Sequence, residues 1–561
     1  MTEPRGSRLD AISLEIYWNR LLAICDEAVT GLIRTAFSTI VRESRDCVSV
    51  ILDVDGDLIA ENRGSVPAFV GCLSPCMKDL LGYFPLETWQ PGDIVMTNDP
   101  WMGTGHRPDI VMVAPVFHDG RIVAFSGNVA HAADIGGVVW AADCHTVHEE
   151  GIGIPPLKLY KAGELNEDIL STIRYNVRVP DMVVGDLFAQ VAALEISGAR
   201  LVDFMSETGM EDLRVVGAPI QDLGERAMRR AISELPDGSY EGVTYLDGYD
   251  QPLKVQATIT VRGDEINVDF AGTSDQVDGG GINVPYNYTQ AYTTYPLKCL
   301  LDPHTTRTSG SFRPITVRAP EGCILNCRYP AAVNARTLTG DTICNVVFMG
   351  LADVLPHRVI AESGTTPPLR IFVSGVGPDE TPFTFHLFAN GGMGARPTAD
   401  GLHCTPYPTN IQCASMEVME SVAPLLVWKK ELAPDSGGPG RYMGGLGQDM
   451  TMEVVSDKPV TLSVISEKWD FPPLGRAGGM AARANRAEKV MGEGPLPRKG
   501  RTQLLPGDVI NLSFAGGGGY GPPTERDPAQ VMEDLRDGLI SEARARSVFG
   551  VDVDPPGDSG R

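Results

Sequence analysis

The stretch GHRPDIVMVAPVFHDGRIVAFSGNVAHAAD, residues 105–134, decides how the N-terminal half of the chain folds. Two runs rich in Val, Ile and Phe, residues 110–117 and 121–129, flank the turn sequence His118-Asp119-Gly120. An Asp-Gly pair between two apolar runs is a strong signal for a tight turn between antiparallel strands. The stretch therefore predicts a β-hairpin with its open end at residues 105–109 and 130–134.

Two histidine and carboxylate pairs lie at that open end, His106-x2-Asp109 and His131-x2-Asp134. They stand out because the chain has only nine histidines, and five of these fall between residues 106 and 148. A divalent ion needs three or four nitrogen and oxygen donors that converge, and two imidazoles with one or two carboxylates suit Zn²⁺, Mn²⁺ or Fe²⁺. His118 lies at the other end of the hairpin, in the turn, where we expect contact with solvent.

Antiparallel pairing explains how the two pairs meet. With the turn centred on Asp119-Gly120, Asp109 lies opposite Ala130 and His106 opposite Ala133. No pair of thiolates lies nearby, so a site with an open position for water is favoured over a closed structural zinc site. The alternative is that the histidines cap strand ends or satisfy buried polar groups.

Further candidate catalytic residues flank the hairpin. Asn98-Asp99-Pro100 precedes it, and these residues either support the site or form a turn in which the Asx side chain bonds its own backbone. A carboxylate or imidazole after the hairpin would serve as general acid or base, the alternative being a solvated loop. These candidates are His145, His148, Glu149 and Glu150.

Composition excludes several classes of partner. A formal net charge of -25 argues against binding to a nucleic-acid backbone. We expect a soluble cytoplasmic protein without a membrane contact, because neither a signal peptide nor a long apolar run is evident. The eleven cysteines form no CxxC pair and are expected to be buried thiols. Gly516–Gly521 lacks the Lys-Ser or Lys-Thr of a phosphate-binding loop and predicts a tight backbone passage.

The pattern along the chain predicts an α+β protein of several domains. The predicted N-terminal region combines helices with the metal-binding hairpin, β-rich domains follow, and the C-terminus is short and helical. Helices are expected at 10–44 (one or two), 163–178, 180–208, 341–362 and, as a short pair, 527–550. Strands are expected within 47–60, 240–345 and 370–470, and an irregular or mobile segment at 473–500. The domains are placed at 1–239 (metal-binding α+β), 240–345 (β-rich), 346–525 (mixed α/β) and 526–561 (helical tail).

Short motifs along residues 10 to 550 resemble those of the hydantoinase B and oxoprolinase family. This family includes the B subunits of ATP-dependent hydantoinases and lactamases and is related to acetone and acetophenone carboxylase subunits. The N-terminal motifs are Arg45-Asp46-Cys47, Pro91-Gly92-Asp93, Asn98-Asp99-Pro100, Gly105 to Asp109, Ala130-His131 and Asp134 to Gly137. The later motifs are Glu150-Gly151-Ile152, Ile154-Pro155-Pro156, Asn176-x-Arg178, Gly185-Asp186-x3-Gln190, Gly272-Thr273-Ser274, Phe312 to Ile315, Gly516 to Gly521, Glu525 to Pro528 and Asp537-Gly538-Leu539.

The resemblance implies a metal site and a division of labour. It implies that Asp46, His106, Asp109 and His131 hold one divalent ion, Zn²⁺ or Mn²⁺, and that Asp134 supports them from behind. It further implies a partner, a hydantoinase A-like ATPase subunit, which uses ATP to phosphorylate a small cyclic amide or imide. This chain would then open the ring of the phosphorylated substrate, within a hetero-oligomer such as A2B2 or larger.

Three positions depart from the family pattern. Ala132 stands where a second histidine is common, Phe69 where a histidine is common, and Ser309 where an asparagine is common. The four implied ligands are retained, so the departures concern the choice of substrate. Two other functions stay open: a subunit of an ATP-dependent ketone carboxylase, and a non-catalytic scaffold for the ATPase subunit.

Overall fold

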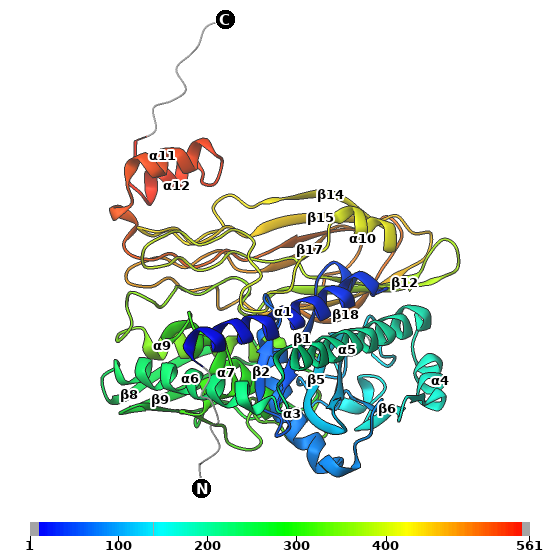
Figure 1. Cartoon of the computed structure of the whole chain (residues 1–561). Helices are drawn as coiled ribbons and strands as arrows, with labels where there is room; N and C mark the ends of the chain where they lie inside the picture. The colour runs from blue at the N-terminus through cyan, green and yellow to red at the C-terminus, as the bar shows by residue number, and fades with distance from the viewer. Residues whose placement is uncertain (1–9, 139, 553–561) are drawn as a thin grey trace, which may run out of the picture.

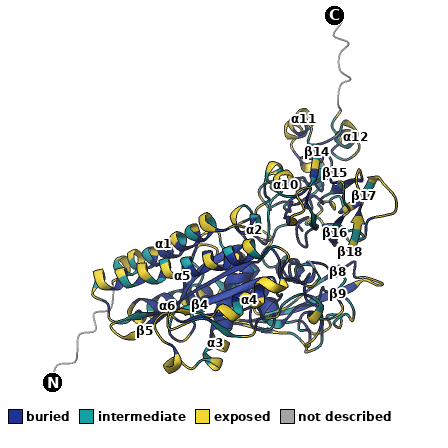
Figure 2. Cartoon of the chain, turned by 90° about the vertical axis from the view of Figure 1, so that its right-hand side faces the viewer, coloured by how far each residue is buried: buried dark blue, intermediate teal, exposed yellow. Residues whose placement is uncertain are grey.

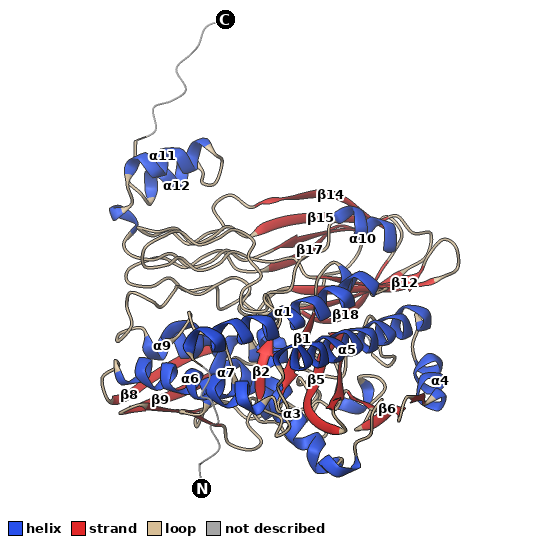
Figure 3. Cartoon of the chain, viewed as in Figure 1, coloured by secondary structure: helices blue, strands red, loops and turns tan. Residues whose placement is uncertain are grey.

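The structure is a computed structural model that describes residues 10–138 and 140–552. Figure 1 shows the N-terminal and central parts, blue to green, side by side beneath the yellow and orange strands of the C-terminal part. Two short red helices, α11 and α12, lie beyond those strands. The predicted α+β, multidomain class with a short helical C-terminus is confirmed, as the mixture of helices and strands in Figure 3 shows.

The N-terminal region is built on a seven-stranded antiparallel sheet. Its strands run in the order β2-β1-β5-β4-β3-β6-β7. The strands are β1 (Cys47–Leu52), β2 (Leu58–Glu61), β3 (Ile94–Thr97), β4 (Asp109–His118), β5 (Arg121–His131), β6 (Leu157–Lys161) and β7 (Glu164–Leu165). The helices of this region are α1 (Ala11–Thr35), α2 (Thr39–Arg42), α3 (Pro67–Tyr83), α4 (Glu167–Asn176), α5 (Pro180–Thr208) and α6 (Arg214–Ser233).

Helices cover both faces of this sheet, which is why its strands are apolar on both sides. Alternate residues of β1 point in opposite directions, so Ile51 packs with α1 and α5 while Val50 packs with α3. Figure 2 shows the strands as buried and the outer side of α1 as exposed. Within the described residues α5 alone is long and apolar enough to cross a membrane, but its contacts with α1, β4 and β5 make it a core helix.

The predicted hairpin is present as β4 and β5, but its predicted register is wrong at the open end. Near the turn the pairing is as expected, with Phe117 opposite Ile122. Beyond it, Val116 pairs with Ala124, so Val123 is an extra residue in a β-bulge. The bulge shifts the register by one and places Asp109 opposite His131 instead of Ala130.

The central region is a four-stranded sheet with helices on one side. Its order is β11-β10-β9-β8, and β9 alternates between buried and half-exposed residues, as expected for a sheet covered on one face. The elements are β8 (Gly238–Leu246), β9 (Leu253–Arg262), β10 (Glu265–Asp269), α7 (Tyr286–Leu301), β11 (Ile315–Arg318), α8 (Thr337–Gly340) and α9 (Thr342–Leu351). The helix expected at 341–362 therefore ends at residue 351.

The C-terminal region is a sandwich of two four-stranded sheets, β13-β12-β16-β18 and β14-β15-β19-β17, which share one apolar core. Its strands are β12 (Arg370–Val376), β13 (Pro382–Leu387), β14 (Leu425–Leu432), β15 (Gln448–Val454), β16 (Val460–Ile465), β17 (Arg486–Met491), β18 (Lys499–Leu504) and β19 (Val509–Ser513). Its helices are α10 (Met416–Val422), α11 (Pro528–Arg536) and α12 (Glu542–Ser547). β17 lies within 473–500, so this segment is not irregular throughout.

Close backbone packing accounts for the glycine-rich strings of this region. A Cβ on Gly444 would lie 1.7 Å from the carbonyl oxygen of Gly517. The backbone of residues 516–521 thus packs closely against neighbouring backbone, as predicted. The largest apolar core runs through all the regions, since it includes Val50, Val255, Phe348 and Phe388. The domain boundaries given above stay a prediction.

Candidate metal centre

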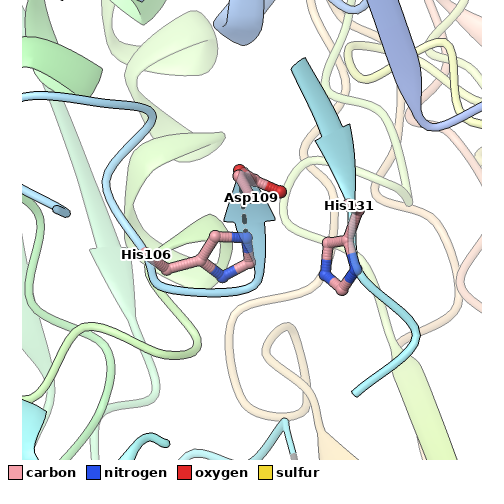
Figure 4. Close-up of side chains that lie close together, drawn as sticks. All are labelled: His106, Asp109 and His131. Atoms are coloured by element: carbon pink, nitrogen blue, oxygen red, sulfur yellow. Dashed lines mark ion pairs between the residues drawn. The ribbon is translucent and has the colours of Figure 1, made fainter. Parts of the chain in front are cut away.

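Three of the predicted ligands come together at the open end of the hairpin. His106 lies in the loop before β4, Asp109 is the first residue of β4, and His131 is the last residue of β5. One ligand atom of each lies within 4.8 Å of the others, and all three side chains are buried. Figure 4 shows the two imidazoles and the carboxylate facing a common space. The bulge in β5 produces this arrangement, because it sets His131 directly across from Asp109.

Hydrogen bonds at the back of each ring fix the tautomers. Nδ1 of His106 lies 3.0 Å from the carbonyl oxygen of Asn334, and Nδ1 of His131 lies 2.9 Å from that of Ala132. A carbonyl only accepts, so each Nδ1 carries the proton and each Nε2 presents a lone pair. Such a second contact behind the ring is the usual arrangement for a histidine that binds a metal.

The front of the site holds electron-pair donors without hydrogen-bond partners. Nε2 of His131 and Oδ1 of Asp109 are buried and bond to nothing in the described part of the chain. Nε2 of His106 lies 3.1 Å from Oδ2 of Asp109, so two acceptors face each other. Two ligands that each lie about 2.1 Å from one ion are about 3 Å apart. These atoms therefore fit a divalent cation.

Arg336, from the segment before α8, holds the carboxylate of Asp109 in place. Its Nη2 lies 2.8 Å from Oδ2 of Asp109, and the hydroxyl of Thr104 donates to the same oxygen. Arg336 passes next to Gly105, where a Cβ would lie 2.6 Å from its Cδ. The Gly-His string of the motif is thus required by the close approach of this arginine.

Asp46 lines the same pocket but lies outside the triad of mutually close groups. It immediately precedes β1, and its carbonyl accepts the N–H of His131 at 3.1 Å. Its side chain is 2% exposed, and its Oδ1 has no partner within the described residues. The backbone contact thus ties Asp46 to the end of β5, and its role as a fourth ligand stays a proposal.

The electrostatics favour ligands that are ready to bind a cation at neutral pH. Burial lowers the pKa of His131 to about 3 and also lowers that of His106, so both rings are neutral. Burial opposes the charge of Asp109, but the guanidinium of Arg336 helps to hold its pKa below the ordinary value. Burial, together with the charge of Asp109, raises the pKa of Asp46.

The triad forms one wall of a narrow pocket whose cavity volume is about 30 Å³. Much of the remaining lining comes from the central and C-terminal regions, hundreds of residues along the chain. They include Tyr288, Arg336, Asp341, Arg370 and Phe388. The pocket thus exists only because the hairpin, α7 and the start of β12 pack together.

Two predicted catalytic residues lie behind the triad. Asp134 accepts from the guanidinium of Arg178 at 2.6 Å, which ties the loop after His131 to the start of α5. Glu150 is fully buried, and its Oε1 accepts the backbone N–H groups of Val333 and Asn334 at 2.6 and 2.8 Å. Both hold the backbone that positions the triad.

The other candidates lie further from the pocket. Asn98 bonds only to backbone, donating to Arg107 at 2.8 Å and accepting from Ile154 at 2.6 Å, so it braces the loop that carries His106. Asp99 forms the predicted Asx turn, since its Oδ1 accepts the N–H of Trp101 at 2.8 Å. His118, His145 and His148 do not join the triad.

Several residues in or beside the pocket have no signal in the sequence. His386, in β13, lies with its ring centroid 5.1 Å from that of His131, and burial holds its pKa well below the ordinary value. Arg336, Asp341 and Arg370 stand in strings that carry no recognisable motif. Phe69 does line the pocket, whereas Ser309 accepts the N–H of Leu58 elsewhere.

A buried cluster of two neutral imidazoles and a carboxylate defines a candidate mononuclear metal site of the kind that metal-dependent enzymes use. The family model described as Hydantoinase B/oxoprolinase matches residues 10–523, and the chain belongs to this family. The predicted family membership is confirmed.

Relatives share most of their length with the chain. A protein of Pseudomonas sp. (strain NS671), provisionally named as the B subunit of a D-/L-hydantoinase, is 30% identical and covers 97% of this chain and 96% of its own. The crystal structure of ATP-dependent caprolactamase from Pseudomonas jessenii has a TM-score of 0.89 at 26% identity and covers 98% of each chain. A nucleotide-free acetone carboxylase structure has a TM-score of 0.86 at 20% identity, over 97% of this chain and 80% of its own, and shares the fold.

Proposed function

We propose that the chain is the metal-dependent subunit of a two-component, ATP-dependent amidohydrolase. Its substrate would be a cyclic amide or imide, such as a hydantoin, 5-oxoproline or a lactam, after phosphorylation by an A-type ATPase subunit. The observation that carries this proposal is the buried triad of His106, Asp109 and His131, in which Nε2 of His131 and Oδ1 of Asp109 have no partner among the described residues. Relatives that are named as hydantoinase and caprolactamase subunits support the choice of reaction.

The residues of the pocket would divide the work as follows. His106, Asp109 and His131 would hold one Zn²⁺ or Mn²⁺, with Asp46 as the proposed fourth ligand. When bound, such an ion polarises an oxygen of the substrate and lowers the pKa of a water. Arg336 keeps Asp109 ionised and oriented, because it lies 2.8 Å from the carboxylate. Burial of the triad excludes bulk water.

Ring opening breaks a carbon–nitrogen bond, and the departing nitrogen needs a proton. Asp341 lines the pocket, its Oδ2 is buried without a partner in the described structure, and burial raises its pKa to about 7. A carboxyl group with this pKa can carry a proton at neutral pH and donate it. We therefore add Asp341 to the proposed catalytic residues. Asp134, Glu150, Asn98 and Asp99 stay proposed as well, and their backbone contacts favour a positioning role.

The partner supplies the phosphorylation in this proposal. ATP would be bound by a hydantoinase A-like subunit and not by this chain, in a cytoplasmic hetero-oligomer such as A2B2. Relatives named as subunits of two-component enzymes support a partner. The purified chain alone is therefore expected to show no ATPase activity.

The test combines the chain with its A partner and ATP, and offers either a cyclic amide or a ketone with bicarbonate. We expect amide-dependent ATP turnover and ring opening, abolished by His131→Ala and retained in the matched control His118→Ala, which alters the other end of the same hairpin. ATP turnover that needs bicarbonate and a ketone would assign a carboxylase instead. Ring opening unaffected by His131→Ala would assign a scaffold.

A further inference from the structure

Arg370 is a buried cation whose charge lacks a counterion. It is the first residue of β12, is 2% exposed, and lines the same pocket as the triad. Its guanidinium donates to the carbonyl of Ala389 and, at 3.3 Å, to the side-chain oxygen of Asn390. Both acceptors are neutral, and no carboxylate oxygen of the described residues lies within 4.0 Å of it.

Two other arginines, one buried and one half-buried, show how the chain balances such a charge. Arg336 lies 2.8 Å from a carboxylate oxygen of Asp109, and Arg307 lies 2.7 Å from one of Glu61. Although burial opposes the charge of Arg307, Glu61 holds its pKa above the ordinary value. Burial instead lowers the pKa of Arg370 to about 10. Burying an unpaired charge lowers the stability of the folded chain. Such a charge is expected where a ligand supplies the opposite charge.

Asp46 and Asp341 line the same pocket, but the oxygen atoms of neither carboxyl lie within 4.0 Å of the guanidinium nitrogens of Arg370. Asp341 accepts a hydrogen bond from Tyr288 at 3.0 Å, and burial raises its pKa to about 7, so it is only partly ionised near neutral pH. The ring of Phe388 lies 5.3 Å from the guanidinium carbon of Arg370 and offers an aromatic face without net charge. Asp109 is already engaged by Arg336.

We propose that Arg370 forms an oxyanion subsite of the metal pocket, which binds a phosphoryl or carboxylate group of the molecule that reacts at the triad. A guanidinium has five donors in a planar fork that matches either group. The partners that this fork has among the described residues, Ala389 and Asn390, are both neutral. The identity of the anion rests on the function proposed above, whereas the subsite itself rests on the position of Arg370.

The experiment measures binding of inorganic phosphate and, separately, of acetate to the full chain by isothermal titration calorimetry, with and without Mn²⁺. Arg370→Met removes the charge at similar length, and Arg370→Lys keeps the charge but loses the fork. The matched control is Arg501→Met, an arginine of the same sheet that pairs at the surface with Asp143. Metal content and thermal midpoint are recorded for each variant.

We expect one of the two anions to bind the wild type, at least about tenfold weaker binding in Arg370→Met, weaker binding in Arg370→Lys, and no change in Arg501→Met. The anion that binds identifies the group. Should Arg370→Met fail to fold, Arg370→Lys decides. Equal binding in the wild type and the folded Arg370 variants, or no binding of either anion, would overturn the subsite. Arg370-dependent binding in a chain that takes up neither Zn²⁺ nor Mn²⁺ would leave the subsite standing and remove the proposed function.

Discussion

Glu150→Gln is expected to remove a loss of stability that the wild type undergoes as the pH rises. Glu150 is fully buried beside the segment that carries Asn334, and burial raises the pKa of its carboxyl to about 8. Its Oε1 accepts two backbone N–H groups, while Oε2 has no partner in the described chain. A glutamine keeps the accepting oxygen and stays neutral at every pH.

The magnitude follows from the shift in the pKa of Glu150. Below its ordinary value of 4.5 the carboxyl is protonated in both the folded and the unfolded chain. Between 4.5 and about 8 only the folded chain keeps the proton, so the free energy of unfolding falls by about 1.4 kcal/mol per pH unit. The loss is complete above the folded pKa and amounts to on the order of 5 kcal/mol.

Urea unfolding of wild type and Glu150→Gln between about pH 5 and about pH 9, followed by tryptophan fluorescence, checks this reasoning. The variant should gain stability relative to the wild type as the pH rises. Glu149→Gln, the same chemical change at the half-buried neighbour, reports the effect of the substitution itself. A difference between wild type and Glu150→Gln that stays constant over the whole range would refute the account of this carboxyl.

Three further outcomes follow from individual contacts. Arg336→Met leaves Asp109 as an uncompensated buried charge, and chemical denaturation should show a loss of about 3–5 kcal/mol. Phe385→Ala opens a cavity in the core of the C-terminal sandwich, and the same method should show a loss of about 3–5 kcal/mol. Gly136→Ala forces a side chain at φ 74° to within 2.3 Å of the carbonyl oxygen of Asn176, so the thermal midpoint and the metal content should both fall.

Local sequence signals are sufficient for the elements that carry the triad. The Asp-Gly turn predicts the hairpin of β4 and β5, and Pro180 correctly separates α4 from α5. The register of the hairpin could not be predicted, because nothing in the apolar runs marks Val123 as a bulged residue. That single extra residue is what brings His131 opposite Asp109.

The rest of the pocket depends on tertiary packing. Arg336, Arg370 and His386 lie about two hundred residues or more after the hairpin in the sequence. Arg336 and Arg370 reach the pocket, and His386 reaches His131, only when the central and C-terminal regions pack beside the hairpin. The sequence around each of these residues shows no local pattern that would mark it as part of a site. Asp46 is brought to the site by the resemblance to the family, because spacing alone does not indicate it.

The metal content of the purified chain tests the central claim most directly. After exposure to Zn²⁺ or Mn²⁺ and removal of excess ion, wild type and His118→Ala should each retain about one equivalent, because the triad forms a single mononuclear site. His131→Ala should retain far less, since it removes one of the converging donors. Less than about a tenth of an equivalent in the wild type, or the same content in His131→Ala, would contradict the account.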